Sequence, residues 1–238
     1  MKLTVLGCDG SWPGPGGACS GYLVTTETTT LWLDAGPGTF ANLQRCVDPR
    51  SIDAVVLSHR HTDHWSDMDG FATYARFSLE RSSVPVFAPE GVRERSGLGG
   101  AEQFVWGTVG DGQRIDVGDL TCTFSRTDHG PPTLAVRVEA AGCSVGYSAD
   151  SGPGWSPARF GGELDLFLCE ATYLRGGEDE GHHLSARQAG QIAKAAGVDR
   201  LVLTHRRPTV AAADAFAEGS EAFGAPVELA AIGKEYIV

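Results

Sequence analysis

The feature that most constrains this chain is the run Ser58–His64, which reads Ser-His-Arg-His-Thr-Asp-His. It follows residues 52–57, an apolar and β-branched segment that predicts a buried strand. His59 and His61 stand two residues apart at the extended end of that strand, so their side chains point to the same side and can hold one metal ion. The aspartate and the histidine that close the run fall on the turn into the next helix, where they face a second position for an ion. Imidazole and carboxylate suit zinc, and also manganese or iron.

Three further candidate ligands occupy similar places in the sequence. His129, Asp150 and His205 each follow a short run that predicts a strand, and each is close to a turn. The chain has only seven histidines, which are His59, His61, His64, His129, His182, His183 and His205. Because most of them lie near predicted strand ends, we expect the ligands to collect at one edge of a sheet.

Length and composition predict one globular domain over residues 1–238, because no linker, charge block or low-complexity tract divides the chain. The six cysteines form no C-x-x-C pair, and several lie in apolar runs, which favours a reduced cytoplasmic protein. The opening residues 1–6 are too short an apolar run for a signal peptide. No apolar run reaches about 18 residues, so no membrane span is expected.

The charge balance limits the class of substrate. The formal net charge is −11, from 19 Lys and Arg against 30 Asp and Glu. Binding a polynucleotide requires a basic surface that neutralises successive phosphates, and the sequence has no such cluster. A long nucleic acid is therefore disfavoured, whereas a small substrate held mainly by metal ions is not.

Two blocks of predicted strands, each interleaved with helices, indicate an α/β fold, specifically a four-layer αββα sandwich. Residues 68–81 predict an amphipathic helix, and the capping box formed by Ser185 and Gln188 predicts another over residues 186–196. Residues 103–111 show no clear pattern. Asp34 has two interpretations that stay open, either a helix or turn cap or a carboxylate that orients the histidine loop.

The order of the seven candidate ligands along the sequence makes the chain resemble the metallo-β-lactamase-fold hydrolases, and the resemblance covers essentially its whole length. The resemblance implies two divalent metal ions, with zinc as the first choice and manganese or iron as alternatives. It assigns His59, His61 and His129 to the first ion. It assigns Asp63, His64 and His205 to the second, with Asp150 bridging both.

Two segments narrow the resemblance to the ribonuclease Z-like phosphodiesterases, namely Cys169–Tyr173 and His183–Ala186. In that branch a histidine, here His183, donates a proton to the leaving oxygen, and a glutamate, here Glu170, holds it. His182 is an alternative candidate for the proton donor, and only the Leu-Ser-Ala that follows His183 favours His183. Ribonuclease Z inserts a long tRNA-binding arm before the bridging aspartate. Here that aspartate lies only 21 residues after His129, which argues against tRNA processing.

The run Leu6–Ser11 and the Asp-Ser-Gly at Asp150 are similar to the actinobacterial-type cyclic nucleotide phosphodiesterases of this superfamily. The function implied is hydrolysis of a small phosphodiester, a 3′,5′-cyclic nucleotide to its 5′-monophosphate, by a hydroxide held between the two metals. Asp63 would align that hydroxide or take its proton. Alternatives are a lactone or thioester hydrolase, ribonuclease Z-like RNA processing, an iron-dependent oxidoreductase and a non-catalytic metal-binding protein. Related enzymes often pair, which leaves a homodimer open.

Overall fold

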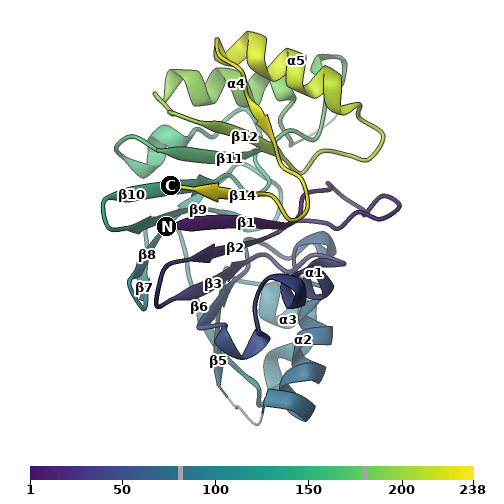
Figure 1. The fold of residues 1–238 in the computed structure, drawn as a ribbon, viewed down its shortest axis with the longest axis vertical. Helices are drawn as coiled ribbons and strands as arrows, with labels where there is room; N and C mark the ends of the chain where they lie inside the picture. The colour runs from purple at the N-terminus through teal and green to yellow at the C-terminus, as the bar shows by residue number, and fades with distance from the viewer. Residues whose placement is uncertain (80–82, 179–181) are drawn as a thin grey trace.

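The computed structural model describes residues 1–79, 83–178 and 182–238, which form two mixed sheets of seven strands each (Figure 1). The first sheet has the order β14-β1-β2-β3-β4-β5-β6. Its strands are β1 (Lys2–Gly7), β2 (Gly21–Thr25), β3 (Thr30–Leu33), β4 (Ala54–Val56), β5 (Val84–Ala88), β6 (Phe104–Thr108) and β14 (Glu235–Ile237). The second has the order β13-β12-β11-β10-β9-β8-β7. Its strands are β7 (Arg114–Val117), β8 (Leu120–Arg126), β9 (Leu134–Ala140), β10 (Cys143–Tyr147), β11 (Leu166–Glu170), β12 (Leu201–Thr204) and β13 (Glu228–Leu229).

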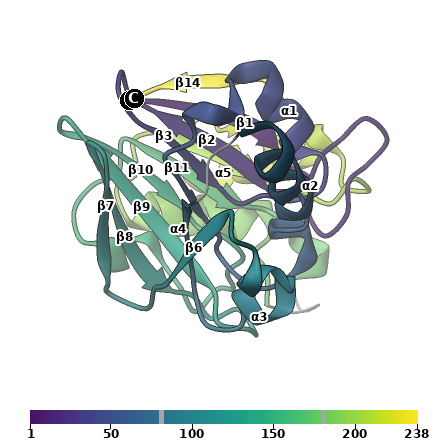
Figure 2. The same ribbon diagram turned by 90° about the horizontal axis from the view of Figure 1, so that it is seen from below.

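Helices cover the outer face of each sheet. The α-helices are α1 (Thr39–Cys46), α2 (Met68–Tyr74), α3 (Val92–Ser96), α4 (Ala186–Ala195) and α5 (Ala212–Phe223). The short helical turns are η1 (Pro49–Ser51), η2 (Thr62–His64), η3 (Ala75–Leu79), η4 (Leu98–Gly100), η5 (Pro157–Phe160) and η6 (Arg175–Gly177). In Figures 1 and 2, α1, α2 and α3 lie beside the first sheet, and in Figure 1 α4 and α5 lie at the opposite end of the molecule. None of the helices within the described ranges is long and apolar enough to span a bilayer.

Strand alternation explains why four layers form. In β2 and β3, Tyr22, Val24 and Leu31 point into the core between the two sheets. Leu23 and Trp32 point the other way, into the core beneath α1 and α2. A third core lies between the second sheet and helices α4 and α5. The expected αββα sandwich is therefore confirmed.

The sequence predicted most elements, with some differences at their boundaries. The capping box at the start of α4 is present, since Ser185 Oγ accepts a hydrogen bond from the Gln188 backbone and the Gln188 side chain accepts one from Ser185. The helix expected over 68–81 is α2 followed by a π-helical turn to Leu79, and residues 80 and 81 lie outside the described residues. The unassigned stretch 103–111 contains β6, which pairs with β5.

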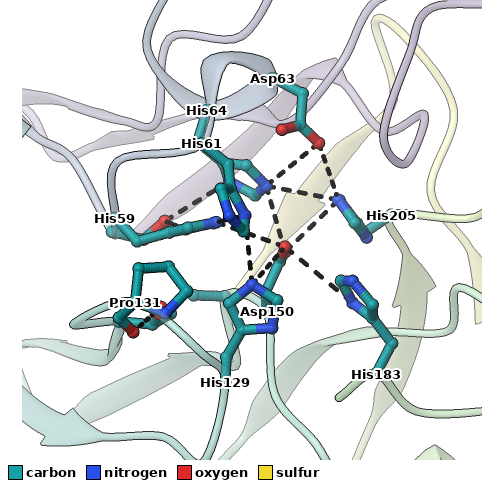
Figure 3. A network of polar contacts seen from close by, with 12 residues as sticks. His59, His61, Asp63, His64, His129, Pro131, Asp150, His183 and His205 are labelled. Carbon is teal, nitrogen blue, oxygen red and sulfur yellow. Dashed lines mark hydrogen bonds and ion pairs between the residues drawn. The ribbon is translucent and has the colours of Figure 1, made fainter. Parts of the chain in front are cut away.

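The topology brings several strand ends to one edge. Strands β10, β11 and β12 are parallel, so their carboxyl ends meet at the same edge. Strand β8 runs in the same direction, because both it and β10 are antiparallel to β9. The carboxyl end of β4 faces this edge from the first sheet, and its histidine loop closes onto it (Figure 3).

Candidate metal centre

The structure brings the seven predicted ligands together at that edge (Figure 3). The loop after β4 supplies four of them, and the segments after β8, β10 and β12 supply one each. Among the described residues, three groups of side chains converge closely enough to hold an ion. They are His59, His61, His129 with Asp150; Asp63, His64 with His205; and Asp150, His205 with His183. The first two groups contain the residues that the resemblance assigns to the first and to the second ion.

In the first group, the inward-facing atoms are His59 Nε2, His61 Nδ1 and His129 Nε2. The His61 nitrogen lies 3.0 Å from that of His59 and 3.2 Å from that of His129. Asp150 Oδ2 lies 3.4 Å from the His59 nitrogen and 3.8 Å from that of His129. Ligands about 2.0–2.1 Å from a tetrahedral ion are separated by about 3.3 Å. The donor atoms therefore already stand at the spacing that such an ion requires.

The second group has the same dimensions. His64 Nε2 and His205 Nε2 lie 3.3 Å apart, and Asp63 Oδ2 is 3.5 Å and 3.3 Å from them. Asp150 Oδ1 lies 3.1 Å from the His64 nitrogen and 3.4 Å from that of His205. The two oxygens of Asp150 thus face different groups, which is the geometry of a bridging carboxylate.

Asp150 Oδ1 is buried and has no hydrogen-bond partner among the described residues. A buried carboxylate oxygen is costly unless it is paired, protonated or bound to a metal. Five histidines have a ring nitrogen within 4.0 Å of this atom or its partner oxygen. The donor set therefore fits a pair of divalent metal ions.

Hydrogen bonds on the outer side of the rings fix which nitrogen faces the centre. His64 Nδ1 donates to Asp34 (2.7 Å), and His129 Nδ1 donates to the His182 carbonyl (3.1 Å). His205 Nδ1 donates to Thr172 Oγ1 (2.9 Å), whose hydroxyl donates to Glu170 (2.6 Å). In the neutral form of each ring, this hydrogen bond keeps the proton on Nδ1 and leaves Nε2 free to face the centre, as a metal ligand must.

Asp34 orients the histidine loop, which decides between its two interpretations. Its carboxylate is fully buried and accepts hydrogen bonds from the Ser58 backbone, the Ser58 hydroxyl, His64 and Tyr147, each at 2.7 Å. Ser58 Oγ in turn lies 3.0 Å from His59 Nδ1. One carboxylate therefore holds a ligand histidine of each group.

The backbone is strained where ligands or their supports meet the centre. Asp34, Ala149 and His205 have φ angles of 55°, 50° and 50°, in the left-handed region that most side chains avoid. Such conformations persist only where surrounding contacts hold them, and they concentrate at functional sites. His205 is a candidate ligand of the centre, Asp34 orients the ligand loop, and Ala149 directly precedes Asp150.

Protonation favours metal binding at the first group. Burial lowers the pKa of His59 to about 4, with the neighbouring His64 acting in the same direction. Burial also lowers the pKa values of His61 and His129. These imidazoles are neutral at neutral pH, the state in which they bind metals. Burial opposes ionisation of Asp150, but the surrounding histidines hold its pKa well below the ordinary value.

His183 and Glu170 form a pair beside the centre. His183 Nδ1 lies 2.9 Å from Glu170 Oε1 and 4.0 Å from Asp150 Oδ2. Burial alone would lower the pKa of His183, but the Glu170 carboxylate and its hydrogen bond raise it to about 9. His182 has an exposed side chain and contributes its carbonyl to His129. The geometry therefore places the side chain of His183, and not that of His182, next to the candidate metal ligands.

A cavity of about 370 Å³ opens over these groups. Its lining residues are Ser11, Arg60, His61, Thr62, Asp63, Arg95, Asp150 and His183. Sequence reasoning missed the two arginines, and also Ser58, Tyr147 and Thr172, which support the ligands. Ser58, Arg60 and Thr172 lie inside the quoted motifs, but the motifs assign them no role, because their roles depend on side chains distant in the chain.

Comparisons with known proteins agree with this geometry. The family described as "Beta-lactamase superfamily domain" matches residues 29–206. The chain is 32% identical to the probable metallo-hydrolase YhfI of Bacillus subtilis over 86% of each chain. It is also 32% identical to the uncharacterized protein Rv1339 of Mycobacterium tuberculosis, over 95% of this chain and 88% of that one. The crystal structure of YhfI matches with a TM-score of 0.91, 27% identity and 99% coverage of both chains. Human tRNase Z, short form, shares the fold with a TM-score of 0.80 at 21% identity, over 100% of this chain and 99% of that one.

Proposed function

This chain belongs to the β-lactamase superfamily and is a metal-dependent hydrolase, and on that basis we propose that it hydrolyses a small phosphodiester. The substrate we propose is a 3′,5′-cyclic nucleotide, and the product is the 5′-monophosphate. The observation that carries the proposal is the His183–Glu170 pair beside the candidate metal centre. The alkoxide leaving group of a phosphodiester gains from a positioned proton donor. The resemblance to the ribonuclease Z-like phosphodiesterases includes this pair, whereas the lactonase and β-lactamase branches are not expected to carry it.

The seven residues His59, His61, Asp63, His64, His129, Asp150 and His205 would hold two divalent ions, with zinc as our first choice. Such ions supply Lewis acidity at the phosphoryl oxygens and lower the pKa of water to about 7. This explains how an acidic chain with few basic residues at its cavity can act on a phosphodiester.

Asp63 is the residue that would orient the attacking water or accept its proton. Its Oδ2 accepts a hydrogen bond from the Ser11 backbone at 3.0 Å, which fixes the carboxylate at the cavity wall. Burial opposes ionisation, but His64 and His205 hold the pKa of Asp63 below its ordinary value. The carboxylate is therefore charged at neutral pH.

His183 is the residue that would protonate the leaving oxygen. Glu170 accepts a hydrogen bond from Nδ1, which leaves Nε2 to carry the transferred proton. Glu170 also accepts hydrogen bonds from the Ser151 backbone and from Thr172, so it is held rigidly. Because Thr172 supports His205 as well, the proton donor and the second metal group share one support.

The test is chromatography of products after incubating the zinc-loaded protein with 3′,5′-cyclic AMP. We expect 5′-AMP, and a loss of about 10²–10⁴-fold in kcat for His183→Ala with unchanged metal content. His182→Ala is the matched control, because it removes an exposed side chain and keeps the carbonyl that supports His129.

Two other outcomes would change the conclusion. Survival of cyclic AMP alongside cleavage of bis(p-nitrophenyl) phosphate would keep the phosphodiesterase chemistry and reject the cyclic nucleotide. Failure to cleave either compound, with hydrolysis of a lactone, would replace the phosphodiesterase proposal by carbon-ester hydrolysis.

A further inference from the structure

Two exposed arginines, Arg60 and Arg95, line the cavity over the candidate metal centre. Arg60 lies between His59 and His61 in the ligand loop, and Arg95 lies on α3. Neither takes part in holding the metal ligands. Both are nevertheless placed where a bound substrate would extend from the centre toward solvent.

A single buried side chain contacts both arginines, at the backbone of Arg60 and at the guanidinium of Arg95. Trp65 Nε1 donates a hydrogen bond to the Arg60 carbonyl at 3.0 Å. The guanidinium carbon of Arg95 lies 5.9 Å from the centre of the same indole ring, which is within the range of a cation–π contact. Trp65 follows His64 directly and is only 6% exposed. The Arg60 backbone and the Arg95 guanidinium are therefore tied to the ligand loop.

Neither guanidinium forms an ion pair or a hydrogen bond with any described residue. Other arginines of the chain do have acidic partners, as in the pairs Arg187–Glu178 and Arg200–Glu228. The guanidinium groups of Arg114 and Arg175 also have no ion pair with a described residue, but Arg60 and Arg95 lie together at one cavity of a chain whose net charge is −11. Positive charge concentrated at a cleft raises the local concentration of anions and orients them.

We propose that Arg60 and Arg95 form a site for a phosphate monoester beside the scissile diester, so that, among linear phosphodiesters accepted in addition to the cyclic nucleotide, those that also carry a phosphate monoester are preferred. This inference rests on the proposed phosphodiesterase function. The scissile diester carries one negative charge, which the metal ions would neutralise, and so leaves no role for two more cations. A phosphate monoester is close to a dianion at neutral pH, and guanidinium groups bind it through paired N–H donors. The cavity volume of about 370 Å³ lies within the range of small-ligand sites.

The test compares two dinucleotides that differ only in the second phosphate, ApA and its 5′-phosphorylated form pApA. With the zinc-loaded protein we expect kcat/KM to be at least about tenfold higher for pApA. The double variant Arg60→Gln, Arg95→Gln should bring the ratio close to one, through a higher KM for pApA. Lysine at both positions should restore part of the ratio, because it keeps the charge without the paired donors.

Arg93→Gln is the matched control on the same helix. Its guanidinium donates to the Gly99 carbonyl at 2.9 Å and does not line the cavity, so the ratio should be that of the wild type. A ratio near one in the wild type, or a high ratio that survives the double substitution, would overturn the inference while leaving the phosphodiesterase proposal intact.

Calorimetric binding of the two dinucleotides separates the inference from the proposed function. Tighter binding of pApA that depends on both arginines supports the phosphate site, even if neither dinucleotide is cleaved. Equal binding of ApA and pApA overturns it, even if cyclic AMP is hydrolysed.

Discussion

Substituting Asp34 by asparagine isolates the role of one carboxylate in building the metal centre. Four donors converge on it, and they are the Ser58 backbone, the Ser58 hydroxyl, His64 and Tyr147. The φ angle of Asp34 is 55°, which asparagine tolerates as well as aspartate does. The change therefore removes the charge and one acceptor without adding backbone strain.

The magnitude follows from the arrangement of the donors. Oδ1 faces the Ser58 backbone N–H and Oδ2 faces the other three donors, so an amide nitrogen in either position meets at least one donor. The least costly orientation keeps the amide oxygen toward His64 and loses the hydrogen bond from the Ser58 backbone N–H. A hydrogen bond to a charged group contributes about 1.5–3 kcal/mol, and a buried donor left unpaired costs a similar amount. We expect the free energy of unfolding to fall by about 2–5 kcal/mol.

Metal affinity should change as well, because Asp34 accepts the outer N–H of His64. Loss of such a supporting carboxylate typically weakens metal binding by about 10–100-fold. Urea unfolding and zinc competition against a chromophoric chelator measure the two effects. Asp53→Asn is the control, since this carboxylate accepts one backbone N–H from Thr30 at 2.8 Å and an amide oxygen can replace it. Wild-type zinc affinity in Asp34→Asn, with a stability loss below about 1 kcal/mol, would refute the reasoning.

Three other predictions follow from the same structure. Gly190→Ala should destabilise the protein by about 1–3 kcal/mol, because the added Cβ would lie 2.6 Å from the Gly219 carbonyl where α4 crosses α5. In Gly70→Ala, on α2, the added Cβ would make only ordinary contacts, and the change should stabilise the protein by up to about 1 kcal/mol. Thermal denaturation of both variants measures the difference, and equal effects on stability would contradict the prediction. Hydrogen bonds from Arg187 lower the pKa of Glu178 in the folded protein, so the folded state binds fewer protons at this carboxylate than the unfolded state does. The resulting stabilisation is present above the pKa of the unfolded state and is lost as the pH falls through the pKa of the folded state. Glu178→Gln should therefore cost less than about 1 kcal/mol at pH 7 and less still at pH 3, and an equal cost at both values would argue against the pair. Zinc at a hundred times its dissociation constant should raise the free energy of unfolding by about 2.7 kcal/mol, an effect that a chelator reverses and that would be absent if the centre bound no metal.

The sequence alone determined the local part of the site. A buried strand followed by His-x-His fixes two ligands on one side of the chain, because side chains alternate along an extended backbone. The same reasoning placed His129, Asp150 and His205 at strand ends and predicted the capped helix α4. The four-layer arrangement followed from two blocks of strands that each needed a helical cover.

Only the tertiary structure decided which groups support the ligands and what faces the cavity. Tyr147 and His64 both donate to Asp34, although they lie 113 and 30 residues away from it. Thr172 connects His205 to Glu170 across neighbouring strands, and the pairing of those strands sets that contact. A hydrogen bond needs an approach of about 3 Å in a defined direction, whereas residue patterns fix only which way a strand or helix turns its side chains. That difference in precision explains why the ligands could be predicted and their supports could not.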